Sequence, residues 1–134
     1  MVDKVSQGKR NRRKGLEFER MVRKYIIGLG WVVDNWTNNI DLETGEIVQA
    51  KTNRFMARSC GFPDFMTFKK AGDGEKGRDV CYLQFVECKT NGKLSKIEKM
   101  KMNVLVKKGF RCYVASKMEN GVKIEEFFGY EDKS

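Results

Sequence analysis

The chain has 134 residues and a net charge of +9, from 27 lysines and arginines against 18 aspartates and glutamates. Its 40% hydrophobic and 34% charged residues exclude an intrinsically disordered chain and fit one globular domain with a polyanionic partner. No apolar stretch approaches the ~20 residues of a membrane span, and the polar start carries no secretory signal. We therefore expect a protein that is not secreted, binds no membrane and stays inside the cell, in the host cytoplasm if it is viral.

The cysteine pattern disfavours a zinc site. The chain has four cysteines, none paired as Cys-x-x-Cys, and no histidine. Cys81 and Cys112 lie in apolar, strand-like runs. We expect reduced, buried thiols, as is usual for an intracellular protein.

A basic segment opens the chain. Residues 1–13 are predicted to form a flexible arm before a single domain of residues 14–134. The segment is interpreted either as a disordered tail or as an arm that orders on nucleic acid. Its candidate phosphate-binding residues, with the first of the domain, are Lys9, Arg10, Arg12, Arg13 and Lys14.

A helix is predicted from about Arg13 to Leu29, because apolar residues recur there at helical spacing and Gly30 can end it. Glu19 lies at the edge of the apolar face. From the helix alone, a flanking ion pair with Arg23 explains Glu19 better than a functional role does.

Strands follow. Residues 31–36 form a predicted strand, and residues 40–42 and 47–49 a predicted hairpin within the irregular segment 37–62. This segment is either a solvated excursion or a nucleic-acid contact, and we favour the contact because its cations precede Pro63-Asp64. Those cations are Lys51, Arg54 and Arg58.

The second half alternates strands with one helix. Strands are predicted at 65–68, 80–86, 111–115 and 122–128, with 80–86 in a central, two-sided position. A capping box, Ser95 with Glu98, opens a helix over 96–108. Its expected core face is Ile97, Met100, Val104 and Leu105. The order predicts an α/β fold with a mixed central sheet and a helix on each side.

Carboxylates and a lysine are predicted to converge at one end of this sheet. Asp64 begins one strand, and Glu87 and Lys89 end its neighbour on a shared face. Cys88 points to the other face, and its carbonyl oxygen is a candidate metal ligand. A hard divalent ion relieves the repulsion between clustered carboxylates, so we expect a Mg²⁺ site, with Mn²⁺ as a substitute.

These motifs resemble the PD-(D/E)XK nuclease superfamily. The matching residues are Pro63-Asp64 and Glu87-Cys88-Lys89, preceded by the helix that carries Glu19. Residues 14–20 resemble the opening of archaeal-type Holliday-junction resolvases, whereas residues 85–95 resemble VRR-NUC nucleases. The resemblance spans roughly residues 14–115 and implies a restriction-endonuclease-like fold.

The resemblance also implies roles. Asp64 and Glu87 are metal ligands, Lys89 is the catalytic lysine, and Glu19 completes the metal shell. Glu98 replaces the VRR-NUC glutamine and is either a further ligand or only the helix cap, which we favour. The long segment 37–62 is explained by neither group.

The expected function is a metal-dependent, structure-selective DNA endonuclease of recombination and repair. A Holliday-junction resolvase is favoured, and it would act on branched DNA as a homodimer. The alternatives are a flap or single-strand nuclease of the same fold and a non-catalytic nucleic-acid-binding module.

Overall fold

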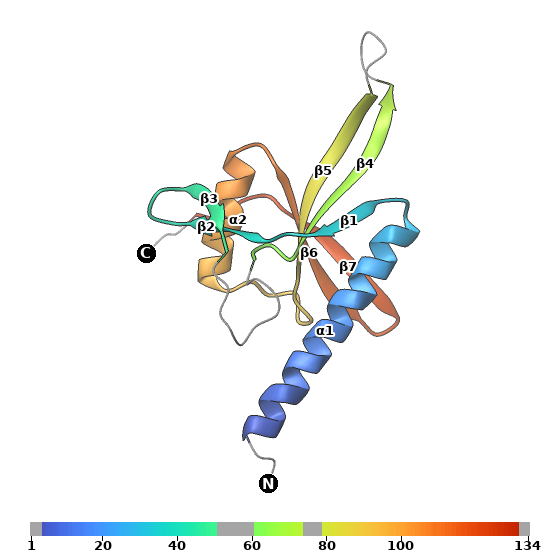
Figure 1. Cartoon of the computed structure of the whole chain (residues 1–134), viewed down its shortest axis with the longest axis vertical. Coiled ribbons are helices and arrows are strands. Elements are labelled where there is room, and N and C mark those ends of the chain that lie inside the picture. Colours follow the sequence, from blue (N-terminus) through green and yellow to red (C-terminus); the bar gives the residue numbers. More distant parts are fainter. Residues whose placement is uncertain (1–3, 51–60, 74–78, 132–134) are drawn as a thin grey trace.

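A computed structural model of the chain describes residues 4–50, 61–73 and 79–131 (Figure 1). Two helices and seven strands occur in these ranges. In chain order they are α1 (Lys4–Gly28), β1 (Val32–Asn35), β2 (Asn38–Asp41), β3 (Glu46–Gln49), β4 (Phe65–Asp73), β5 (Asp79–Cys88), α2 (Lys96–Lys107), β6 (Arg111–Met118) and β7 (Gly121–Phe127).

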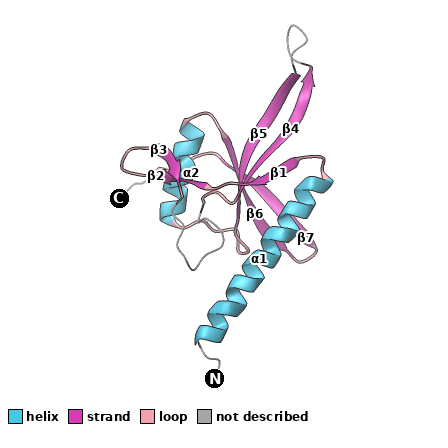
Figure 2. Ribbon diagram, in the orientation of Figure 1, coloured by secondary structure: helices cyan, strands magenta, loops and turns pink. Residues whose placement is uncertain are grey.

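Five strands form one mixed sheet in the order β1-β4-β5-β6-β7 (Figure 2). The β5–β6 pair is parallel, because α2 connects the two strands, and the other pairs are antiparallel. β2 and β3 form the predicted hairpin as a separate two-stranded sheet. The predicted α/β class with a mixed sheet is therefore confirmed.

The two helices cover opposite faces of this sheet. On one face, α1 buries Phe18, Val22 and Ile26 among Val33, Phe65, Val86 and Ala115. On the other face, α2 buries Met102 and Leu105 among Ile40, Phe62, Phe85 and Cys112. Adjacent residues of β5, Phe85 and Val86, thus enter different cores, which confirms the predicted two-sided position of this strand.

Several predicted boundaries were wrong. α1 begins at Lys4 instead of Arg13, so the basic residues that follow Lys4 belong to the helix. Lysine and arginine are good helix formers, and no proline interrupts them. Whether residues 1–13 act as an arm distinct from the domain stays a prediction. β4 and β5 also extend beyond the predicted strands, as a hairpin that projects from the body (Figure 1).

Two predictions about burial were also wrong. Cys81 is exposed, because it lies on the projecting part of β5, whereas Cys112 is buried as predicted. On α2, Ile97 is 52% exposed and Met102 is fully buried. The first turn of α2 contacts Lys89, just past the end of β5, through Glu98, and Ile97 in the same turn is left exposed.

Neither helix in the described part of the chain combines the length and apolar character that crossing a lipid bilayer requires.

Candidate active site

The backbone before β4 determines where Asp64 lies. Gly61 packs against the main chain of Trp36 so closely that a Cβ at this position would collide with the Trp36 carbonyl oxygen. The amide of Phe62 then donates to the carbonyl of Asn38 (2.8 Å), and the amide of Trp36 to the carbonyl of Asp64 (3.0 Å). A glycine at position 61 therefore lets the chain reach β4 with Asp64 fixed at its start.

The carboxylates of Asp64 and Glu87 each accept a hydrogen bond from a backbone amide of the neighbouring segment. The amide of Cys88 donates to Oδ2 of Asp64 (2.8 Å), and the amide of Asp64 donates to Oε1 of Glu87 (3.1 Å). β4 pairs with β5 through Phe65 and Val86, so the two carboxylates lie at the same end of the sheet. The structure thus brings these two predicted residues together.

The environment of Glu87 disfavours the ionised form of its side chain. Its side chain is buried, with the whole residue 5% exposed. Burial, followed by the nearby charge of Asp64, raises the pKa of Glu87 to about 10, although the charge of Lys89 acts to lower it. A cation beside this pair would favour the ionised form of Glu87.

Lys89 lies between two carboxylates. Its Nζ is 3.8 Å from Oε2 of Glu87 and 2.6 Å from Oε2 of Glu98. Partial burial acts to lower the pKa of Lys89, but the hydrogen bond to Glu98 and the charge of Glu87 outweigh it and raise this pKa. The ammonium group therefore stays charged. The predicted shared face of Glu87 and Lys89 is confirmed by their contact.

Glu98 has two partners, one on each side-chain oxygen. Oε1 accepts from the amide of Ser95 (2.8 Å), which completes the predicted capping box, and Oε2 binds Lys89. Burial acts to raise the pKa of Glu98, but the hydrogen bonds from Lys89 and Ser95 outweigh it and lower this pKa. The prediction of a cap is confirmed, and the residue also holds the lysine. A role for Glu98 as a metal ligand stays a prediction.

Cys88 lies on the face of the sheet that α1 covers, and Glu19 is a residue of α1. Cys88 packs against the core beneath α1, as its predicted direction requires. Burial, the charges of Asp64 and Glu87, and then the charge of Glu19 raise the pKa of the Cys88 thiol. Glu19, on α1, is therefore near the end of β5. Its membership of a metal shell stays a prediction.

The donor set at this end of the sheet suits a hard divalent ion. Asp64 and Glu87 offer carboxylate oxygens, and the raised pKa of Glu87 shows how poorly two negative charges are tolerated there without a cation. Among the described residues, no three acidic, cysteine or histidine side chains already surround a point where an ion could sit. A pair of carboxylates is nevertheless a suitable donor set for Mg²⁺, which is commonly bound by one or two carboxylates and keeps several of its waters.

The predicted nucleic-acid-binding residues divide into two groups. Those of the basic segment are exposed on α1: Lys9, Arg10, Arg12, Arg13 and Lys14. The other three, Lys51, Arg54 and Arg58, lie outside the described residues. Two residues that the sequence did not single out, Thr90 and Lys117, face Lys14 across a groove. No local pattern marks them, because they meet only through the parallel pairing of β5 and β6.

Comparisons of the chain with protein-family models, curated proteins and solved structures found no match.

Replacing Glu98 separates its two interactions. Glu98→Gln keeps an oxygen that can accept from Ser95 but loses the ion pair with Lys89. If the site has the cleavage activity expected from the sequence, we expect thermal stability close to wild type and cleavage reduced about 10- to 100-fold, because losing a residue that positions a catalytic group has effects of this size. Glu98→Ala should also lose about 1 kcal/mol of stability from the cap. Thermal unfolding and cleavage rates check both variants, and equal cleavage by Glu98→Gln and wild type would contradict the positioning role.

Proposed function

We propose that the chain is a Mg²⁺-dependent endodeoxyribonuclease that hydrolyses backbone phosphodiesters in branched DNA, with the four-way junction as its preferred substrate. The observation that carries the proposal is the interlocked pair of Asp64 and Glu87, with Lys89 beside it, at the end of two paired strands. A restriction-endonuclease-like assignment of the sheet is part of the same proposal.

The acidic pair would hold the ion. Asp64 and Glu87 supply the side-chain oxygens, and the carbonyl of Cys88 and the carboxylate of Glu19 are the proposed additional ligands. The chemistry that such an ion supplies is polarisation of the phosphate and a lowered pKa of water. The backbone amides that bind both carboxylates keep them in place, so little reorganisation is needed when the ion binds.

Lys89 would stabilise charge during the reaction. Its ammonium is oriented by Glu98 and lies on the same face as Glu87. Because its pKa is raised, it carries a positive charge at neutral pH and is poorly suited to act as a general base. Its role would be to bind the attacking water or the phosphate, where negative charge increases in the transition state.

Cleavage of a four-way junction implies two copies of the chain. Two symmetric cuts require two active sites, and a two-fold homodimer supplies them. DNA shape, instead of base sequence, would then select the substrate.

The test is a cleavage assay on equal-length DNAs: a four-way junction, a flap, a plain duplex and a single strand. Each is incubated with Mg²⁺, Mn²⁺ or EDTA. Paired nicks in the junction that need a divalent ion would support the proposal. Cleavage of the flap or single strand alone would support metal-dependent hydrolysis but reject the four-way junction as the substrate. Binding without cleavage under every condition would favour a non-catalytic module.

Deleting residues 1–13 tests the contribution of the basic segment. The deletion removes Lys4, Lys9, Arg10, Arg12 and Arg13. We expect weaker DNA binding and a smaller salt dependence, by about 0.9 in the slope of log K against log salt for each lost contact to duplex phosphate. Fluorescence anisotropy at several salt concentrations measures this slope. An unchanged slope would show that the segment makes no phosphate contacts.

A further inference from the structure

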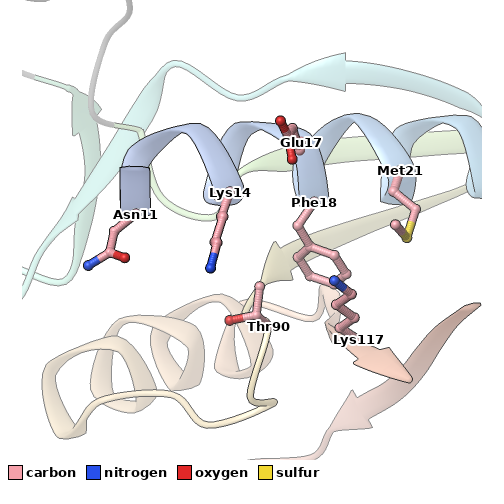
Figure 3. A pocket seen from close by; sticks show the side chains of 8 residues that line it. Asn11, Lys14, Glu17, Phe18, Met21, Thr90 and Lys117 are labelled. Carbon is pink, nitrogen blue, oxygen red and sulfur yellow. The ribbon is translucent and has the colours of Figure 1, made fainter. Parts of the chain in front are cut away.

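A groove of about 510 Å³ lies between the first half of α1 and the ends of β5 and β6 (Figure 3). Its far wall is held together by a hydrogen bond from the amide of Lys117 to the carbonyl of Thr90 (3.1 Å). Thr90 follows Lys89 directly in the chain. The groove therefore lies on the α1 side of the sheet, one residue along the chain from Lys89, whose ammonium group pairs with Glu98 of α2.

Four of the five polar side chains that line the groove can donate hydrogen bonds; the fifth is the carboxylate of Glu17. In Figure 3, Asn11 and Lys14 extend from α1 toward Thr90, whereas Glu17 points away from them. Lys117 reaches the groove from the end of β6. Within the described part of the chain, neither lysine has an ion pair with a carboxylate. Two ammonium groups, an amide and a hydroxyl thus face one space, which is the chemistry that binds a phosphate.

The remaining wall of the groove is apolar. Phe18 and Met21 line it one turn further along α1; Phe18 is buried in the core, whereas Met21 is 41% exposed and supplies the accessible apolar surface. A volume of this size is within the range of about 300–1,000 Å³ in which proteins bind small organic ligands. An apolar wall next to a cationic one suits a sugar or base attached to a phosphate.

We propose that this groove binds one unstacked nucleotide of a nucleic-acid strand, with its phosphate between Lys14 and Lys117 and its base or sugar against Met21. A base inside a duplex has both faces covered by its neighbours, so only an unstacked nucleotide can use the apolar wall. The inference rests on the proposed function and deepens it, because it assigns the recognition of branched DNA to a nucleotide that is unstacked at the branch point.

Gly15 allows a sharp test of this proposal. It lines the groove, and a Cβ added to it would have nothing within 4 Å. Gly15→Glu therefore introduces a negative charge into the groove without a clash, and glutamate favours the helix more than glycine does. Gly28 is also in α1, is equally open and does not line the groove. Gly28→Glu is the matched control with the same net charge.

The measurement is fluorescence anisotropy in EDTA, with a dye-labelled oligothymidine and a blunt duplex of the same length. We expect Gly15→Glu to weaken oligothymidine binding about tenfold or more, because an added charge would lie beside the bound phosphate. Gly28→Glu should stay within about twofold of wild type. The double variant Lys14→Gln/Lys117→Gln should reduce the salt slope for the oligothymidine by about 0.7–1.4.

Two results would overturn the groove as a nucleotide site. One is equal oligothymidine affinity in Gly15→Glu and Gly28→Glu. The other is an equal loss of duplex and oligothymidine binding in Gly15→Glu, which would indicate general electrostatics. The assay contains no divalent ion, so it is independent of cleavage. Loss of oligothymidine binding in Gly15→Glu, in a protein that never cleaves DNA, would reject the proposed nuclease and keep the groove.

Discussion

Glu87→Gln is expected to abolish cleavage while raising the stability of the metal-free protein. Glutamine matches glutamate in size and retains an oxygen that can accept from the amide of Asp64, so the local structure should persist. The lost carboxylate charge should reduce cleavage at least about 10³-fold, because Glu87 is a ligand of the proposed ion, and such an ion contributes several kcal/mol in the transition state. Cleavage of the preferred DNA with Mg²⁺ measures this loss.

The gain in stability follows from the raised pKa of Glu87. Its pKa rises from 4.5 to about 10 in the folded chain, so the folded state holds a proton that the unfolded state releases. The contribution of Glu87 to stability is therefore most favourable below pH 4.5 and decreases as pH rises toward about 10, by at most about 1.4 kcal/mol per pH unit. Near neutral pH, the raised pKa thus lowers the free energy of unfolding by up to about 3 kcal/mol. Glu87→Gln should recover part of this loss.

Thermal unfolding in EDTA across this pH range checks the expectation. The difference in melting temperature between Glu87→Gln and wild type should increase with pH. Glu43→Gln, at an exposed position in the β2–β3 turn, is a control that should run parallel to wild type. A Glu87→Gln protein that unfolds at a lower temperature than wild type at neutral pH would show that the carboxylate serves the fold instead of a bound ion.

The central elements of the fold were predictable because their patterns are local. Apolar residues of α1 recur at helical spacing, and Ser95 with Glu98 forms a cap from residues three apart. The end of β5 could likewise be identified, since an apolar run stops at Glu87. A pairing between the start of β4 and the end of β5 then follows from a single hairpin, and the structure has this pairing.

The rest depends on contacts between distant segments. The exposure of Cys81 could not be predicted, because an apolar strand looks the same in the sheet and in a projecting hairpin. The ion pair of Lys89 with Glu98 requires the first turn of α2 to lie just past β5, which depends on how the whole helix packs. The groove between Lys14 and Lys117 combines residues 103 positions apart (117 − 14) and has no signature in either segment.

Replacing Asp64 should separate its structural role from its chemical role. Both Asp64→Asn and Asp64→Ala should lose cleavage at least about 10³-fold, since neither retains the carboxylate. Asp64→Asn keeps an oxygen for the amide of Cys88, whereas Asp64→Ala leaves this amide without its acceptor. The alanine variant should therefore be about 1–3 kcal/mol less stable than the asparagine variant, as measured by urea unfolding in EDTA.

Asp64→Asn should lose cleavage but not DNA binding. Asp64→Asn removes a negative charge that repels the DNA phosphates from a chain of net charge +9. The variant should therefore bind a four-way junction in EDTA as tightly as wild type or slightly more tightly. The charge of Asp64 also raises the pKa of Glu87, so its removal should lower that pKa and reduce the pH dependence of stability. If Asp64→Asn cleaves at the wild-type rate, Asp64 is a strand-fixing residue only, and the proposed ion site must be abandoned.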